Sequence, residues 1–142
     1  MRAVRVDQFG EPGVLVTGNV DDPEPAAGQL LVDVRMAGVA YGDVIVRSGR
    51  YPLPLPWTPG LEVAGQVVAA GPGTDESLVG KTVVATTAGQ AGGYAERALA
   101  TAAYTFPVPT VWPSMPPWPC SRPARWPAGC CPRCGSRPPT RC

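Results

Sequence analysis

The chain has 142 residues, which is enough for one domain with a real core and little more. Its net charge of +1 conceals an uneven distribution, because residues 1–97 contain 11 acidic and 7 basic side chains, whereas the remainder contains 5 arginines and no acid. Those arginines are scattered among prolines and form no patterned basic face, so we expect no nucleic-acid partner.

No apolar run approaches the roughly 20 residues that a membrane-spanning helix requires, and the first residues do not have the pattern of a signal peptide. Residues 1–109 contain no cysteine, which is typical of proteins in a reducing compartment. We therefore expect a cytoplasmic protein without membrane contact.

The chain up to about residue 109 has the pattern of a mainly β domain. Strand-like apolar patterns separated by Gly- and Pro-rich turns occur at residues 1–6, 14–16, 30–39, 61–70, 83–86 and 93–99. Gly65 lies inside one of these strands and indicates a bulge or a close approach of two backbones. Several short strands at regular spacing predict a closed or partly open β-barrel.

Residues 41–49 interrupt this pattern, because Val44, Ile45 and Val46 are continuous instead of alternating. Asp43 is placed to cap a first helical turn, and Gly49 is placed to end it, so we predict one short helix. Asp43 and Arg47 would then have the i,i+4 spacing of an ion pair, and structural support is the role that we expect of them.

The composition changes near residue 109. Residues 106–142 hold 11 of the 19 prolines and all five cysteines, and so dense a run of proline forbids regular helix or central strand. We therefore predict two parts, a domain over residues 1–109 and a disordered Pro/Cys/Arg-rich tail over residues 110–142. The cysteine spacing fits no four-ligand zinc ribbon, so we expect no metal.

The most informative motifs lie between residues 37 and 68. They are Gly38-Val39-Ala40 with Asp43 after it, Arg47-Ser48-Gly49-Arg50-Tyr51-Pro52, and Pro59-Gly60-Leu61-Glu62-Val63-Ala64-Gly65. With residues 9–12, 79–83 and 92–96 in unbroken order, they resemble the medium-chain dehydrogenase/reductase superfamily, and within it the quinone oxidoreductase branch. The resemblance covers roughly residues 1–109 and implies a GroES-like, partly open β-barrel, the N-terminal domain of alcohol dehydrogenase-like enzymes.

The resemblance also implies a zinc-independent reaction. Ala40 stands where zinc-dependent relatives have Cys, and Leu61 stands where they have His, so the catalytic zinc ligands are missing. Glu62 survives from that pattern, and we expect it to be a buried structural partner. Hydride transfer from NADPH to a quinone or an enone needs no metal, because the conjugated system delocalises the developing charge.

Tyr51 is the candidate proton donor that the resemblance implies. A phenol is neutral near physiological pH and can donate to an enolate-like oxygen, although Tyr51 could equally pack at the lip of the cleft without a chemical role. Tyr41, Asp43 and Arg47 are candidate cofactor-binding residues at the cleft. Ala40 replaces the usual Asn there, which weakens the case for cofactor contacts.

Relatives continue after the position of Pro109 with Asp-Gly-Leu, an Ala-rich helix and a Rossmann domain that binds NADPH. No such domain is indicated here, since neither residues 71–73 nor residues 79–82 complete a nucleotide-binding fingerprint. If the frame is shifted by one base, however, codons for residues 110–120 permit Asp-Gly-Leu-Ala-Phe-Asp-Ala-Ala-Val-Ala-Leu. We therefore interpret the tail as frameshifted.

On this interpretation the chain is the N-terminal fragment of an NADPH-dependent quinone or enone oxidoreductase, inactive by itself and binding no cofactor. Two alternatives stay open: a genuine proline-rich interaction tail, and a non-enzymatic β-barrel that binds a partner through an exposed face. The oligomeric state stays open as well.

Overall fold

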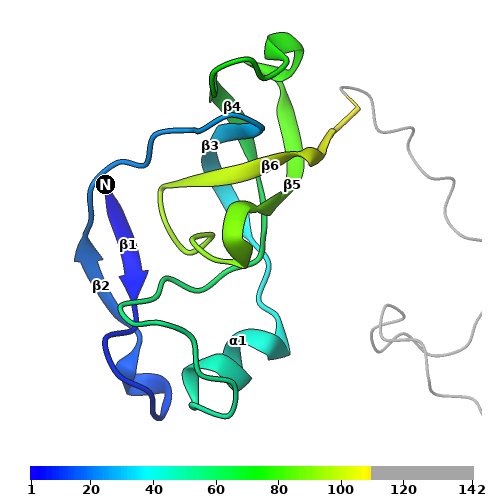
Figure 1. Cartoon of the computed structure of the whole chain (residues 1–142). Helices are drawn as coiled ribbons and strands as arrows, with labels where there is room; N and C mark the ends of the chain where they lie inside the picture. The colour runs from blue at the N-terminus through cyan, green and yellow to red at the C-terminus, as the bar shows by residue number, and fades with distance from the viewer. Residues whose placement is uncertain (110–142) are drawn as a thin grey trace, which may run out of the picture. The chain divides into compact units, whose positions relative to one another are not determined.

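Four antiparallel strands form a barrel in the computed structural model, which describes residues 1–109 (Figure 1). Each strand pairs with the next along the chain, and pairing of the first with the last closes the barrel. The barrel strands are β3 (Gln29–Ala37), β4 (Glu62–Ala70), β5 (Thr82–Thr87) and β6 (Arg97–Pro107).

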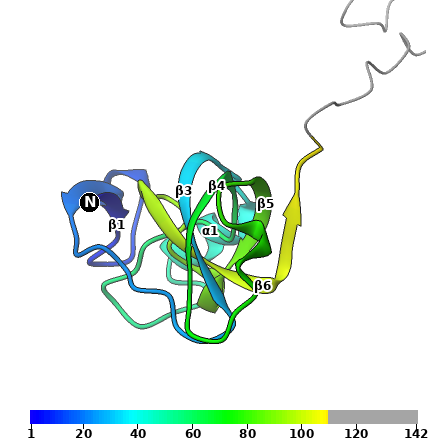
Figure 2. The ribbon, with the colours of Figure 1, turned by 90° about the horizontal axis from the view of Figure 1, so that it is seen from above.

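The remaining elements are short. A two-stranded sheet of β1 (Arg2–Arg5) and β2 (Val16–Asn19) precedes the barrel, and α1 (Tyr41–Arg47) lies between β3 and β4 in the sequence. Viewed from above, β1 lies to one side of the barrel strands (Figure 2). Three single 3₁₀ turns complete the set: η1 (Pro12–Val14), η2 (Glu76–Leu78) and η3 (Ala88–Gln90). The predicted mainly β, barrel-like fold with one short helix is confirmed.

The barrel core consists of small and β-branched side chains, as strand alternation requires. Every barrel strand contributes two side chains that are almost wholly buried. They are Leu30, Val32, Val63, Val67, Val83, Ala85, Ala98 and Ala100. None of them is polar, so the barrel is held by apolar packing and by its own backbone hydrogen bonds.

The last strand differs from its prediction. We expected a strand over residues 93–99, but β6 begins at Arg97 and continues to Pro107. Residues 93–96 pair elsewhere, since Tyr94 accepts a backbone bond from Val4 and Glu96 donates one to Arg2. β6 is long because its first half pairs with β3 and its second half pairs with β5, with an irregularity in the register between them.

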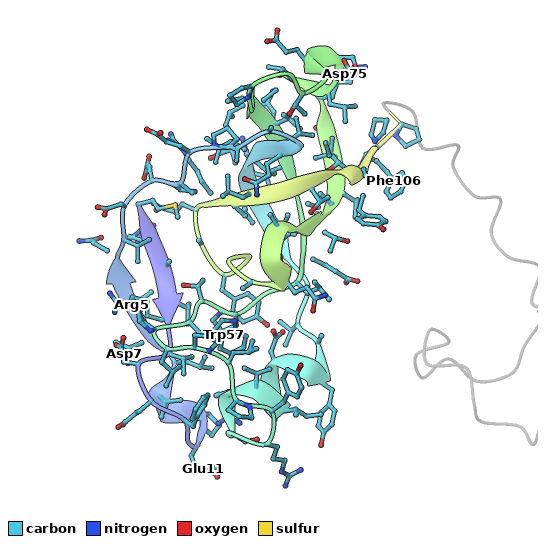
Figure 3. The ribbon with its side chains drawn as sticks, in the orientation of Figure 1. Arg5, Asp7, Glu11, Trp57, Asp75 and Phe106 are labelled. Atoms are coloured by element: carbon cyan, nitrogen blue, oxygen red, sulfur yellow. The ribbon has the colours of Figure 1, made fainter. Side chains whose placement is uncertain are left out.

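Trp57 joins the N-terminal sheet to the rest of the molecule (Figure 3). Its backbone exchanges two hydrogen bonds with Val6, of 2.8 and 3.0 Å, and both residues are buried. The indole Nε1 of Trp57 has no hydrogen-bond partner within the part of the chain that the structure describes. Burial of the ring therefore holds Trp57 in place, without help from its polar atom.

The predictions for residues 110–142, a disordered and frameshifted tail beyond a domain boundary at residue 109, lie outside the described residues. Within residues 1–109, no helix is long and apolar enough to cross a membrane. That same part contains no group of three or more His, Cys, Asp and Glu side chains that could hold a metal ion.

The backbones of β3 and β4 approach each other closely at Gly65, as the sequence indicated. A Cβ atom on Gly65 would lie 2.0 Å from the carbonyl oxygen of Asp33, which is far inside van der Waals contact. The register of the two strands shifts on either side of this point, between Leu31 and Val32 and between Val34 and Met36. Only glycine allows this approach.

We expect Gly65→Ala to lower the free energy of unfolding by about 3 kcal/mol or more, because β3 and β4 would have to separate. Gly13→Ala is the matched control, since nothing lies within 4 Å of the place that its Cβ would take. We expect that control to change stability by less than about 1 kcal/mol. Urea unfolding measures both variants, and equal midpoints would contradict the close approach.

Candidate functional site

The first turn of α1 is capped by its own carboxylate. Ala40 is extended, and its backbone N–H donates to Asp43 Oδ2 at 3.1 Å. This bond satisfies one of the donors that a helix leaves unpaired at its start. The capping role that the sequence predicted for Asp43 is thus confirmed, and α1 ends at Arg47, followed by Gly49 with a φ of +79°.

Asp43 also connects α1 to two distant segments. Its Oδ1 accepts from the backbone N–H of Gly60 at 3.2 Å, and its Oδ2 accepts from the hydroxyl of Tyr94 at 3.0 Å. One carboxylate therefore joins the start of α1, the turn before β4 and the segment that leads into β6. The last two of these parts, at Gly60 and Tyr94, are 17 and 51 residues from Asp43 in the sequence.

The predicted ion pair between Asp43 and Arg47 is wrong. Arg47 donates from its guanidinium to the carbonyl oxygen of Gly10, and no salt bridge joins it to Asp43. The i,i+4 spacing allows such a pair on a helix surface, where it is worth only a few tenths of a kcal/mol. Here each side chain has a partner outside the helix. Both residues support the structure, as expected, but through different contacts.

The turn at Gly60 fits against Tyr94 so closely that no side chain could stand there. Gly60 has a φ of +99°, and a Cβ on it would lie 2.7 Å from Tyr94 Cδ1 and 2.8 Å from the Cα of Gly93. Gly93 and Tyr94 each donate a backbone hydrogen bond to this turn, to the carbonyls of Gly60 and Pro59. The hydroxyl of Thr87 also donates to the Gly60 carbonyl, at 3.1 Å. The partners of Asp43 are therefore fixed in place.

Burial and the neighbouring carboxylate together raise the pKa of the Tyr94 hydroxyl to about 12, burial being the larger cause. The hydrogen bond to Asp43 and its negative charge act in the same direction, because both favour the neutral phenol. Tyr94 is therefore a neutral donor to Asp43 under physiological conditions. Sequence reasoning did not single it out, although the motif of residues 92–96 contains it.

The other predicted site residues lie at the surface. The side chains of Tyr51 and Tyr41 are 63% and 69% exposed, and neither hydroxyl makes a hydrogen bond within the described part of the chain. The structure brings Asp43 to Tyr94 and Gly60, and it does not join Tyr51 to Tyr41, Asp43 or Arg47 by any hydrogen bond among the described residues.

The expectation that Glu62 is buried is wrong. Glu62 is the first residue of β4 and is exposed, because alternation turns its side chain away from the core that Val63 enters. Its carboxylate lies over the backbone of Gly38, where a Cβ would be 3.1 Å from Oε2. Within residues 1–109 it forms no salt bridge, so it is an uncompensated charge at the end of the barrel near α1.

An open groove of about 590 Å³ lies between β1, the end of β3 and residues 93–96. Tyr94 forms part of its wall, and the exposed side chains of Met36 and Val39 line it with apolar surface. Arg2, Arg35 and Glu96 supply its charged rim. The groove is shallow and open, and it combines apolar area with a few charged groups.

The ionisation of Tyr94 should be measurable as a loss of stability at alkaline pH. A phenol whose pKa is about 12 when folded, against 10.0 when exposed, contributes stability that is complete below pH 10.0 and is lost as the pH rises through about 12. We expect wild-type protein to lose more stability than Tyr94→Phe between about pH 10 and about pH 12, as measured by urea unfolding.

Tyr104→Phe is the control for this prediction. The Tyr104 side chain is 61% exposed, and its hydroxyl has no hydrogen bond to any described residue. It should retain the alkaline loss of the wild type. The charged residues that share the groove with Tyr94 are present in all three proteins, so their effect on stability cancels in the comparison. They are Arg2, Arg35 and Glu96. An alkaline loss that persists unchanged in Tyr94→Phe would assign it to another group.

Comparison with known proteins gives a consistent family. Residues 26–110 match the family described as alcohol dehydrogenase GroES-like domain. Quinone oxidoreductase of Lama guanicoe is 45% identical over 103 residues, which cover 70% of this chain and 31% of that protein. Quinone oxidoreductase of Homo sapiens is 43% identical over 104 residues, with coverage of 70% and 31%.

Solved structures agree with this result. The mycobacterial protein Rv1454c, complexed with NADPH, has a TM-score of 0.71 and 40% identity, with coverage of 78% of this chain and 34% of that chain. Quinone oxidoreductase of Escherichia coli, complexed with NADPH, has a TM-score of 0.71 and 29% identity, with coverage of 77% and 33%. The chain spans about a third of the length of these relatives. It belongs to the alcohol dehydrogenase GroES-like domain family, in the quinone oxidoreductase branch of the medium-chain dehydrogenase/reductase superfamily.

Proposed function

We propose that residues 1–109 are the substrate-side domain of an NADPH-dependent quinone or enone oxidoreductase that works without zinc. The observation that carries this proposal is the family match combined with Ala40 and Leu61 at the two positions where zinc-dependent relatives have ligands. Neither side chain has an atom that binds a metal. NADPH in two similar solved structures supports the choice of cofactor.

The residues near α1 fit the nicotinamide end of a dinucleotide better than its phosphates. Val39, Tyr41 and Tyr51 offer apolar and aromatic surface that is 83%, 69% and 63% exposed, as a planar ring requires. In contrast, the described residues contain no glycine-rich turn that opens a long helix, the arrangement that holds a pyrophosphate. We therefore infer that this chain alone does not retain NADPH.

In the proposed reaction, NADPH supplies a hydride to the conjugated substrate. The electron pair moves to the substrate oxygen, which must then take a proton or a hydrogen bond. We assign that donation to the Tyr51 hydroxyl, which lies beyond the end of α1 and has no competing partner among the described residues. The quinone oxidoreductases among the similar proteins, together with Ala40 and Leu61 at the two expected ligand positions, support a quinone or enone as the substrate class.

We also propose that the gene is frameshifted near codon 109, so that the natural enzyme continues into a cofactor domain. The shifted codons permit an Asp-Gly-Leu start followed by an Ala-rich amphipathic segment, which a random tail would seldom yield. The relatives, of which this chain spans about a third, support that proposal.

NADPH titration of the purified 142-residue chain tests the proposed fragment. We expect no saturable quenching or shift of NADPH fluorescence in the micromolar range, because a domain without a phosphate cradle provides too few contacts. A protein made from the gene with the frame restored at codon 109 is the matched comparison, and it should bind NADPH and oxidise it with 1,4-benzoquinone.

Micromolar binding by the short chain would contradict the proposed fragment. A frame-restored protein that binds NADPH yet reduces neither quinones nor enones would contradict the proposed reaction. Nucleotide sequence that leads into no glycine-rich βαβ unit in any frame would remove the frameshift and favour a β-barrel binding module.

In the frame-restored enzyme, we expect Tyr51→Phe to lower kcat by about 100-fold with little change in KM, because loss of a proton donor acts on the transition state. Tyr104→Phe removes a hydroxyl from an equally exposed tyrosine on β6 and should leave kcat unchanged. A Tyr51→Phe enzyme with wild-type kcat would mean that Tyr51 only packs at the cleft.

A further inference from the structure

The short helix α1 is attached to the molecule in an unusual way, because none of its residues is buried. A surface helix in a globular protein normally buries an apolar face, which supplies most of its stability. Val44 in α1 is instead exposed, as is Tyr41. Ile45 and Val46 are half-buried, so apolar packing holds α1 only in part.

Polar contacts at the two ends of α1 attach the helix to the rest of the domain. At the C-terminal end, Arg47 donates from its guanidinium to the Gly10 carbonyl, and its own carbonyl accepts from the Gly10 N–H at 2.9 Å. Gly49, just beyond, rests against Phe9, since a Cβ there would be 3.2 Å from Phe9 Cβ. This end of α1 is therefore attached to the loop before η1.

At the N-terminal end, the link to the barrel depends on Asp43. Of its three hydrogen bonds, the one from Ala40 lies within the first turn, and those from Gly60 and Tyr94 reach the barrel side. Tyr94 is the one side-chain donor to Asp43 among the described residues, and its bond of 3.0 Å is shorter than the 3.2 Å bond from Gly60. A bond from a neutral donor to a carboxylate is stronger than one between neutral groups.

Tyr94 is itself held firmly. Its carbonyl accepts from Val4 at 2.8 Å, and its N–H donates to Pro59 at 2.9 Å. Gly60 leaves no free space beside the ring. The hydroxyl of Tyr94 is therefore a fixed point on the barrel, whereas Asp43 belongs to a helix that could otherwise shift.

We propose that Tyr94 and Asp43 are positioning residues, whose hydrogen bond fixes α1 and the segment leading to Tyr51 at one place on the barrel. This role rests on the proposed function, in which Tyr51 donates a proton and must therefore be held in one place. Since the barrel core includes no side chain of α1, the helix is free to open without exposing that core. Loss of the bond should therefore release α1 locally and leave the barrel folded.

Amide hydrogen exchange on the 142-residue chain tests the local release without any cofactor. The N–H groups of Ser48, Gly49 and Arg50 donate to carbonyls of α1 and report its opening. In Tyr94→Phe we expect them to exchange about 10-fold faster, while exchange of the β3 and β4 amides accelerates much less. Tyr104→Phe is the matched control and should alter neither group.

A second measurement reports on Tyr51 itself. The chain has four tyrosines, so incorporation of 3-fluorotyrosine gives four ¹⁹F resonances, each assigned by its Tyr→Phe variant. We expect Tyr94→Phe to shift or broaden the resonances of Tyr41 and Tyr51 and to leave that of Tyr104 unchanged. If Tyr94→Phe does not yield folded protein, Asp43→Asn replaces it, because that change keeps the shape and, by removing the charge, weakens the hydrogen bonds that Asp43 accepts.

Equal acceleration of exchange in α1 and the barrel would overturn the proposal, because it would show a general structural role. Unchanged exchange in α1, or an unchanged Tyr51 resonance, would overturn it as well. Neither experiment involves NADPH or turnover, so their failure leaves the proposed reaction standing. Failure of the frame-restored enzyme to reduce quinones would in turn leave the placement of α1 intact.

Discussion

The closure of the barrel by β6 is the constraint on which the rest of the structure depends. β6 pairs with β3 along its first half and with β5 along its second, so a single long strand completes the ring. The segment that leads into it, residues 93–96, lies between β1 and the turn at Gly60 and bonds to both. Closing the barrel therefore also fixes the N-terminal sheet and the position of Tyr94.

The candidate site is built on this arrangement by electrostatic contacts more than by apolar ones. A carboxylate that accepts three hydrogen bonds is stable only if its donors are already in place, because organising them afterwards would cost entropy. Here two of the donors belong to segments that the barrel has fixed. The organisation near α1 comes from Asp43, which connects the start of the helix to Gly60 and Tyr94.

The sequence predicted the parts of this structure that depend on neighbouring residues. The alternation of apolar and polar residues predicted the strands, and its interruption at Val44 predicted the helix. Asp43 was correctly identified as the cap of that helix. The close approach at Gly65 was also evident, because a glycine inside a strand pattern has few other reasons to be there. The family was recognisable because its motifs depend on spacing along the chain.

Contacts between distant residues were not predictable. The Asp43 partner lies 51 residues away at Tyr94, and the Arg47 partner is a backbone carbonyl 37 residues away, so local spacing suggested a pair that does not form. Glu62 was assigned to the interior because its motif resembles a zinc site, but its place in the alternation of β4 turns it outward. The end of β6 was missed because the alanines of residues 98–103 give alternation little contrast.

The lack of buried side chains in α1 has a consequence for how such a domain diversifies. Substitutions at exposed positions of a helix that adds nothing to the core alter the shape and chemistry of a binding surface at almost no cost in folding. A lineage could thus try new residues at Tyr41 or Val44 while keeping the Asp43 and Arg47 attachments. The barrel would carry the stability, and α1 would be the part on which selection for new substrates acts.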